Sequence, residues 1–229
     1  MAAALPCYNP EFPVNPKPLI SLMKPSLHLA IACAILSVSA AVGQTPEEVK
    51  AKVKGVKTQA VQTPDFLVGN GGNVKRWKPR EWLEVDAEIE IDLANSAGGR
   101  DGTLDVIQIN LYVALNAKDE NGKRYVARAT QAFKDIPSGD ESHALFFIAP
   151  STLKRLFKKD NFLPTSDVQG WGIELVVGGK VLAADSSLGN QPWWEQSENF
   201  AMVDGVLVTK NKTPFAPLWG DYDLGVDAP

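Results

Sequence analysis

The segment from Leu83 to Leu93 alternates between apolar and acidic side chains at every position. A period of two places successive side chains on opposite faces, which is typical of a β-strand with one face on a core. An α-helix would scatter both sets around its axis. The pattern therefore predicts one strand with its apolar side chains buried and its acidic side chains exposed. The predicted buried residues are Leu83, Val85, Ala87, Ile89, Ile91 and Leu93, and the predicted exposed residues are Glu84, Asp86, Glu88, Glu90 and Asp92.

Other apolar or alternating segments indicate an all-β, mainly antiparallel protein. The dipeptides Asn121-Gly122 and Gly178-Gly179 favour hairpin turns. One short helix is predicted after Pro150, with Ser151 as its N-cap. About seven strands and a single helix favour an immunoglobulin-like β-sandwich over a barrel or an α/β fold. The other predicted strands are Val49 to Val61, Leu104 to Leu115, Arg124 to Phe133, Ala144 to Ala149, Trp171 to Val177, Lys180 to Ala184 and Ala201 to Thr209.

The first 43 residues are predicted to be a leader. Residues 23–43 contain an apolar stretch from Leu27 to Val38 and small residues up to Gly43, which is the layout of a secretory signal peptide. A membrane-spanning helix is the alternative, but this stretch is shorter than the roughly 20 residues that a bilayer requires. Residues 1–22 are rich in proline, and our hypothesis is that they are a gene-model extension.

Processing would leave a mature chain without cysteine. Cleavage between Gly43 and Gln44 satisfies the requirement for small residues, and cleavage after Ala40 is the alternative. Both cysteines, Cys7 and Cys33, lie upstream of either cleavage site, so the mature chain cannot form a disulfide. We therefore predict an exported protein of the periplasm, outer membrane or cell surface that is not an integral membrane protein after processing.

The composition argues against enzymes and nucleic-acid-binding proteins. The chain has two histidines, and His143 is the only one in the predicted mature part, without a nucleophile turn or zinc motif to use it. We expect no catalytic residues, no metal and no cofactor, and we interpret His143 as an edge-strand residue with a polar neighbour. The formal net charge of −4 repels phosphate, so nucleic acid is not a predicted partner.

Two basic clusters and an acidic C-terminus leave weaker alternatives open. The clusters lie at residues 75–80 and 154–159, and we interpret them as solvated faces, with an acidic partner as the alternative. The spacing of Asp221, Asp223 and Asp227 is similar to the start of a calcium loop, but the later ligands of such a loop are missing.

The chain from residue 213 to 229 is predicted to be an extended tail that follows the sandwich of residues 44–212. Pro214 and Pro217 have no backbone donor, so this segment should end the sheet. Its large apolar side chains are costly to expose. The tail therefore folds back over its own sandwich or docks on a neighbouring subunit, and we favour the first arrangement.

Four aromatic side chains are the predicted binding residues. Trp193 and Trp194 follow a polar loop, where adjacent indoles can stack on sugar rings or anchor a protein partner. The alternative is that one of them seals the end of the sandwich while the other covers it. Trp219 and Tyr222 of the tail complete the set.

Over residues 44–229 the chain resembles a small group of secreted Verrucomicrobial pilus-like proteins. The resemblance is carried by the signal peptide ending AAVGQ, the cysteine-free mature chain, the strand WLEVDAEIEID, the hairpin WGIELVVGGK and the tail KTPFAPLWGDYD. It implies an immunoglobulin-like fold, no enzymatic activity and a role associated with a type IV pilus-like system at the cell surface. One departure is that the apolar stretch of residues 27–38 precedes the predicted cleavage site, whereas a type IV prepilin keeps its apolar helix.

These observations together predict a secreted, non-enzymatic structural or interaction protein of a type IV pilus-like surface system. The lost apolar helix favours an accessory or differently assembled component over a standard major pilin. Its expected partners are other proteins of that assembly. The alternative is an adhesin module that binds glycans or proteins through an exposed pair of Trp193 and Trp194.

Overall fold

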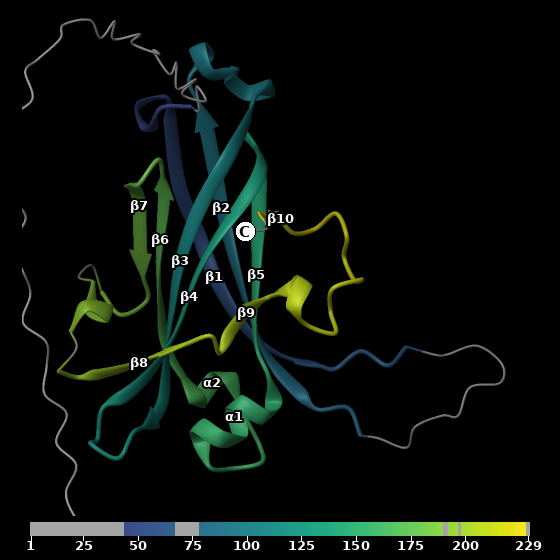
Figure 1. Cartoon of the computed structure of the whole chain (residues 1–229), viewed down its shortest axis with the longest axis vertical. Helices are drawn as coiled ribbons and strands as arrows, with labels where there is room; N and C mark the ends of the chain where they lie inside the picture. The colour runs from purple at the N-terminus through teal and green to yellow at the C-terminus, as the bar shows by residue number, and fades with distance from the viewer. Residues whose placement is uncertain (1–43, 67–77, 190–191, 197, 228–229) are drawn as a thin grey trace, which may run out of the picture. The chain divides into compact units, whose positions relative to one another are not determined.

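The computed structural model describes residues 44–66, 78–189, 192–196 and 198–227. The predicted leader, residues 1–43, lies outside the described residues. Two sheets pack against each other in the described part, with two short helices at one end (Figure 1). The predicted all-β, mainly antiparallel sandwich is therefore confirmed.

The first sheet contains four strands, and all of their pairings are antiparallel. In spatial order they are β1 (Val49–Gln62), β2 (Glu81–Leu93), β5 (Glu141–Ile148) and β9 (Leu207–Thr209).

The second sheet contains six strands. Five of them follow the order β10 (Gly225–Val226), β4 (Arg124–Pro137), β3 (Thr103–Lys118), β6 (Val168–Val177) and β7 (Lys180–Ser186). The sixth, β8 (Phe200–Asp204), pairs in parallel with β4. The helices are α1 (Pro150–Phe157) and α2 (Pro164–Asp167), and the short 3-10 turns are η1 (Pro46–Glu48), η2 (Asn95–Ala97), η3 (Gly99–Asp101), η4 (Trp193–Glu195) and η5 (Lys210–Lys212).

The core lies between the sheets and is built from alternate residues of the central strands. Strands β2 and β5 contribute one wall, and β3, β4 and β6 contribute the other. Phe133 of β4 and Phe146 of β5 meet edge to face across this core, with ring centroids 5.8 Å apart. Burial of these side chains supplies the main favourable contribution to folding.

The alternation in β2 is half confirmed. All six apolar side chains of residues 83–93 are buried, as predicted. The prediction that all five acidic side chains are exposed is wrong for Glu84 and Asp86, which are 4% and 9% exposed. The reason is that the C-terminal tail covers this part of the outer face, so a polar face of the sheet is not in water here. Glu88 and Glu90 are half-buried, so of the five only Asp92 is fully exposed as predicted.

Both predicted hairpin turns are present. Strands β3 and β4 pair on either side of Asn121-Gly122, and β6 and β7 pair on either side of Gly178-Gly179. Gly178 and Gly179 both have positive φ angles, 56° and 79°, which glycine adopts without strain.

Residues 201–209, predicted as one strand, form two strands in different sheets. Strand β8 pairs with β4 of the second sheet, and β9 pairs with β5 of the first sheet. Gly205, at a φ of 72°, lies between them and allows the chain to change direction. The segment therefore crosses from one sheet to the other at the side of the sandwich.

The helix prediction is correct in place but wrong in its start. Helix α1 begins at Pro150, with Ala149 as its N-cap, so Ser151 lies inside the first turn and does not cap it. Proline at the first position fits because its missing N–H would have had no helical acceptor. Helix α2 was not predicted, since its four residues carry no periodic pattern.

The tail is not extended, which corrects the prediction for residues 213–229. Its described part makes a series of turns from Thr213 to Tyr222 and then rejoins the second sheet as β10, paired with Phe133 and Lys134 of β4. The two prolines lie in the turns and so take no part in a strand. The tail belongs to the same compact unit as the sandwich.

Candidate functional site

Trp193 and Trp194 lie on the outer face of the second sheet and are buried, at 5% and 6% exposure. They pack with Ala114, Val126 and Tyr112 of β3 and β4. The sequence-based alternative of an exposed pair is therefore corrected. The indoles cover one face of a sheet, where their burial contributes to stability.

The position of Trp194 depends on two neighbours, the ring of Tyr112 and the glycine at 172. Its ring stacks on Tyr112, with centroids 4.8 Å apart and an interplanar angle of 8°. A Cβ atom added at Gly172 of β6 would come within 2.2 Å of the same ring. Trp193 is held by a hydrogen bond from its Nε1 to Ser186 Oγ, at 2.8 Å. The indole pair is thus fixed in place by the sheet beneath it.

A small acidic pocket of about 350 Å³ lies beside Trp194. Glu174, Asp185 and Glu195 line it. The Glu174 carboxylate accepts hydrogen bonds from Asn110 Nδ2 at 3.0 Å and from Tyr112 Oη at 3.2 Å. Burial and the nearby Glu174 charge raise the pKa of Tyr112 to about 12. Tyr112 therefore stays a hydrogen-bond donor across the physiological range.

Trp219 and Tyr222 lie over the first sheet, on the opposite side of the sandwich from the indole pair, and each is 46% exposed. Tyr222 Oη donates to Asp86 Oδ2 at 2.8 Å, and its ring stacks on His143 at 4.2 Å. His143 Nδ1 lies 2.9 Å from Asp86 Oδ1. Burial and the Asp86 carboxylate raise the pKa of Tyr222 to about 12.

His143 has the predicted polar neighbour, but the edge of its strand is covered. His143 forms a parallel β-bridge with Asp223, and the backbone oxygen of His143 accepts a hydrogen bond from Leu224 N at 2.8 Å. The tail therefore takes the place of a further strand beside the first half of β5.

A buried lysine fixes the tail. Lys210 is 6% exposed and donates from Nζ to the backbone oxygens of Leu218 and Trp219, at 2.5 and 3.1 Å. It also forms an ion pair with Asp223. Asp223, one of the three aspartates considered for a calcium loop, is thus engaged in holding the tail. A buried charge with this many partners is costly to disrupt from one side.

Phe215 forms a second, smaller core between the tail and the outer face of the first sheet. Its side chain is 1% exposed and stacks on Phe147 of β5 at 4.7 Å. Trp82 of β2 contacts it edge to face at 5.7 Å, and Trp219 lies over it at 6.2 Å. This aromatic cluster gives the tail an apolar anchor that the turn residues alone could not supply.

Glu84 is the least satisfied group beneath the tail. Its Oε1 accepts a hydrogen bond from Gln59 Nε2 at 2.6 Å, but its Oε2 is buried without a partner among the described residues. Burial raises the pKa of Glu84, and the neighbouring Asp86 charge adds to this effect. The ionised form of Glu84 therefore lowers the stability of the folded state.

We expect Glu84→Gln to raise the midpoint of thermal unfolding at about pH 8. A raised folded pKa means that stability is full below the unfolded pKa and falls as pH rises through the folded pKa, and the amide removes that loss. The gain comes from removing a buried charge and amounts to about 1.4 kcal/mol for each unit by which the folded-state pKa is raised. Calorimetry at about pH 8 and about pH 4 measures it.

The exposed Glu81 on the same strand provides the control. Glu81→Gln should leave the midpoint nearly unchanged at both pH values, because its carboxylate is in water. A Glu84→Gln protein that gains no stability at the higher pH, or gains equally at both, would show that the Glu84 charge is not penalised.

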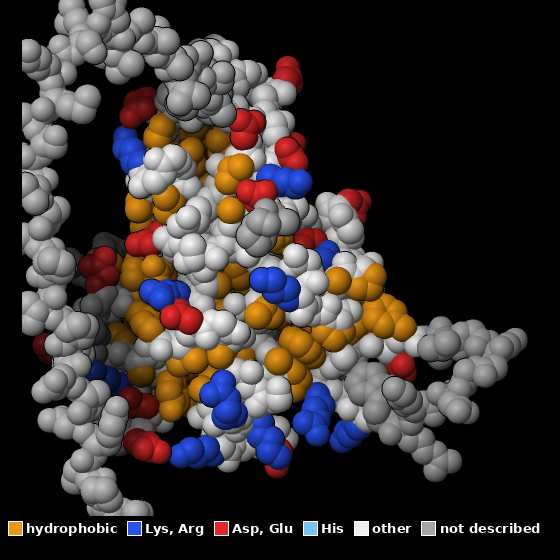
Figure 2. All heavy atoms as spheres, in the orientation of Figure 1, with side chains coloured by type: hydrophobic (Ala, Val, Ile, Leu, Met, Phe, Trp, Pro, Cys, Tyr) orange, Lys and Arg blue, Asp and Glu red, His pale blue; other side chains and the backbone are white. Residues whose placement is uncertain are grey.

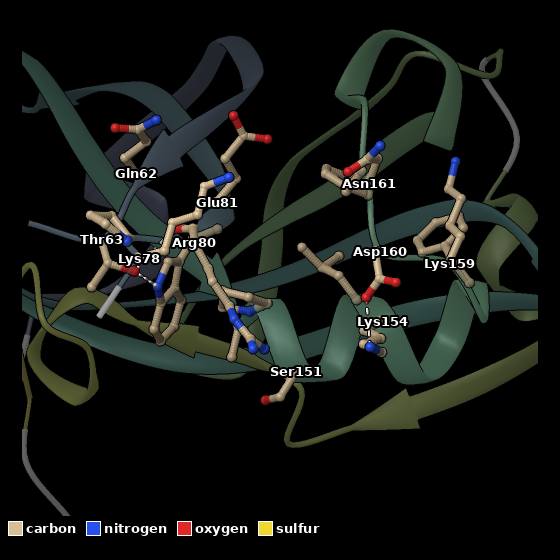
Figure 3. A pocket seen from close by; sticks show the side chains of 17 residues that line it. Gln62, Thr63, Lys78, Arg80, Glu81, Ser151, Lys154, Lys159, Asp160 and Asn161 are labelled. Atoms are coloured by element: carbon tan, nitrogen blue, oxygen red, sulfur yellow. Dashed lines mark hydrogen bonds and ion pairs between the residues drawn. The ribbon is translucent and has the colours of Figure 1, made fainter. Parts of the chain in front are cut away.

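A groove of about 1090 Å³ lies at the helical end of the sandwich. It lies where β1 ends, β2 begins and α1 follows β5 (Figure 3). Trp82 Nε1 donates to Thr63 Oγ1 at 3.0 Å on one wall. We call it the basic groove. Its apolar lining includes Trp82, Leu153, Phe157 and Phe162, and its basic side chains are Lys78, Arg80, Lys154 and Lys159.

The charges of the basic groove are only partly balanced. Lys154 pairs with Asp160 at 2.5 Å, which lowers the pKa of that carboxyl. Lys159 pairs with the buried Asp167 at 2.7 Å. Among the residues that the structure describes, the side chains of Lys78 and Arg80 form no ion pair. An excess of positive charge therefore faces solvent beside an aromatic surface.

The structure does not bring the four predicted aromatic binding residues together. One pair covers the second sheet and the other lies on the first, so they cannot form a single site. Sequence reasoning missed the basic groove, because it treated residues 75–80 and 154–159 as separate solvated faces. The pairing of Leu83 with Ile148 places the start of β2 beside the end of β5, and this brings Lys78 and Arg80 close to the second cluster.

A protein-family model matches residues 43–228, nearly all of the region after the predicted leader. The chain belongs to this family. No curated protein matches it. A crystal structure from Akkermansia muciniphila shares the fold, with a TM-score of 0.69 and 20% sequence identity over 79% of this chain and 94% of that chain.

Within the described ranges, no helix combines the length and the apolar character that crossing a bilayer would require.

Proposed function

We propose that this chain is an exported, non-enzymatic interaction protein of a type IV pilus-like surface system, with an immunoglobulin-like sandwich as its scaffold. The family match begins at Gly43, beside the predicted cleavage site, which is consistent with a leader followed by one folded region. The structural relative comes from a verrucomicrobial bacterium, the group to which the sequence resemblance points.

The observation that carries the proposal is the basic groove. Two segments distant in the sequence meet there to form an aromatic floor with cationic side chains along its rim. Aromatic side chains and arginine are enriched where proteins bind one another, because they combine a large contact area with directed polar groups. This surface suits a protein partner with exposed carboxylates.

The burial of the Trp pair argues against the alternative function, an adhesin that binds through Trp193 and Trp194. Trp193 and Trp194 are packed between the sheet and neighbouring side chains, so neither indole face is available to a sugar ring without rearrangement. Trp219 and Tyr222 remain partly exposed, and a glycan array with the purified protein tests them. Tight sugar binding that Trp219→Ala abolishes would favour the adhesin.

Cell fractionation and site-specific cross-linking in the native bacterium test the proposed function. A photo-reactive amino acid at Lys154, on the groove, should capture proteins of the surface assembly from the envelope fraction. The same probe at Lys57, which is exposed on β1, serves as the control and should capture them much less. A protein that remains in the cytoplasm, or that yields no groove-dependent adduct with an envelope protein, would overturn the proposal.

A further inference from the structure

The two ends of the sandwich differ in charge. The end that holds α1 carries the basic groove, and Arg155 and Lys158 of the same region are also exposed. Figure 2 shows Lys and Arg side chains gathered over this end. The basic side chains at this end are Lys78, Arg80, Lys118, Lys123, Arg124, Lys154, Arg155, Lys158 and Lys159, and the acidic side chains are Asp65, Glu81, Asp119, Glu120, Asp160 and Asp167, so positive charge is in excess.

The opposite end is acidic. The register places the end of β2, the start of β3, the end of β4 and the start of β5 there, together with η1, η2 and η3. We call this region the acidic end. Its acidic residues are Glu47, Glu48, Glu90, Asp92, Asp101, Asp105, Asp135, Asp140 and Glu141, and its basic residues are Lys50, Lys52, Lys54, Arg100, Lys134 and Lys180.

Two turns present the carboxylates of the acidic end to solvent. Asp101 follows Arg100 in η3, and Asp140 lies in the turn between β4 and β5. The turns touch, since Ser138 N donates to Gly102 O at 3.0 Å. Asp101 and Asp140 are both exposed, and neither makes an ion pair among the described residues. They are therefore available to cations of another molecule.

We propose that the basic groove of one molecule receives the acidic end of a second copy of the same chain. This inference rests on the proposed function and names the partner of the groove. The two surfaces lie at opposite ends of the strands, so one copy can offer both at once. A head-to-tail contact of this kind does not close on itself and extends into a row of subunits.

Charge complementarity favours this occupant over others. The groove places Lys78 and Arg80 beside apolar side chains, and the acidic end supplies carboxylates on projecting turns. A nucleic acid would have to approach a chain with a formal charge of −4.

Sedimentation velocity of the purified protein, expressed with its own leader, tests the inference. The wild type should self-associate as its concentration rises, and about 0.5 M salt should weaken the association because exposed charges are screened. Two double variants reverse the charges: Lys78→Glu with Arg80→Glu in the groove, and Asp101→Lys with Asp140→Lys at the acidic end. Each should weaken self-association by about tenfold or more.

Mixing the two double variants provides the decisive arm. The reversed groove of one then faces the reversed acidic end of the other, so the mixture should associate although neither variant does alone. Lys57→Glu with Lys212→Glu makes the same change in net charge as the groove variant, but Lys57 lies beside Asp86 in the middle of the first sheet and Lys212 follows β9, so this variant should behave as the wild type. Circular dichroism checks that every variant is folded.

A wild type that stays monomeric at high concentration and low salt overturns the inference. Reversed variants that associate like the wild type, or a mixture that gains nothing, overturn it as well. So does a monomer that instead binds heparin or DNA through Lys78 and Arg80. Cross-linking at Lys154 distinguishes this failure from failure of the proposed function. If the inference fails but the proposed function holds, the groove should still form an adduct with a different envelope protein.

Discussion

Removal of residues 213–229 is expected to lower the midpoint of thermal unfolding of the monomer sharply or to prevent folding. The deletion takes away Phe215, whose truncation alone should cost about 3–5 kcal/mol. It also exposes Phe147 and Leu145 and removes the partners of Lys210, which are the backbone oxygens of Leu218 and Trp219 and the carboxylate of Asp223. This total is comparable with the stability of a whole domain.

Calorimetry or urea titration of the truncated protein measures the loss, and Phe215→Ala keeps the test informative if the truncated chain does not fold. Trp219→Ala is the matched aromatic control, because Trp219 is 46% exposed and should matter much less. A truncated monomer as stable as the full chain would mean that the tail docks elsewhere, on a neighbouring subunit.

Gly172→Ala should destabilise the protein by about 1–3 kcal/mol or more, which is the usual cost of overpacking. The added Cβ would lie 2.2 and 2.4 Å from two ring atoms of Trp194, so the indole must leave its stack on Tyr112. Urea titration measures the stability, and tryptophan fluorescence should shift to the red as the indole enters water.

Gly55→Ala is the control for this substitution. Gly55 also lies in a strand, but nothing is within 4 Å of the position that a Cβ atom would take there, so alanine should be tolerated. The double variant Gly172→Ala with Trp194→Leu should recover part of the loss, because the smaller side chain leaves room for the Cβ. Equal stability of Gly172→Ala and the wild type would show that Trp194 is not confined.

The alternation in β2 shows what a sequence pattern can predict. Every apolar residue of that strand from Leu83 onward is buried, because side-chain period and sheet pleat are the same physical repeat. The pattern could not predict that Glu84 and Asp86 are covered. Tyr222 covers Asp86, and Glu84 lies between Gln59 and Phe147, the residue on which Phe215 stacks. Nothing local to β2 encodes these contacts, because Phe215 and Tyr222 come far later in the chain.

Burial of the indole pair was predicted only as an alternative, and the basic groove was missed, for related reasons. Polar residues before Trp193 suggested an exposed loop, whereas the glycine at 172 that makes room for Trp194 lies in a different strand. The groove depends on the register between β2 and β5, which is a property of the pairing and not of either segment. The sequence shows where the charged residues lie along the chain. It does not show which of them are close in space, because the residues that form the groove are far apart in the sequence.

Strands β8, β9 and β10 affect how the chain folds, because they complete the two sheets late in the sequence. Each pairs with a strand formed much earlier in the sequence, and Gln131 contacts Asp227 across 96 residues. Such non-local pairing slows folding, since the loop-closure entropy is lost before the contact is gained. The outer edges of β4 and β5 stay open until the C-terminus arrives. A chain delivered from its N-terminus, as in synthesis or export, therefore completes its sandwich only when its last residues are released.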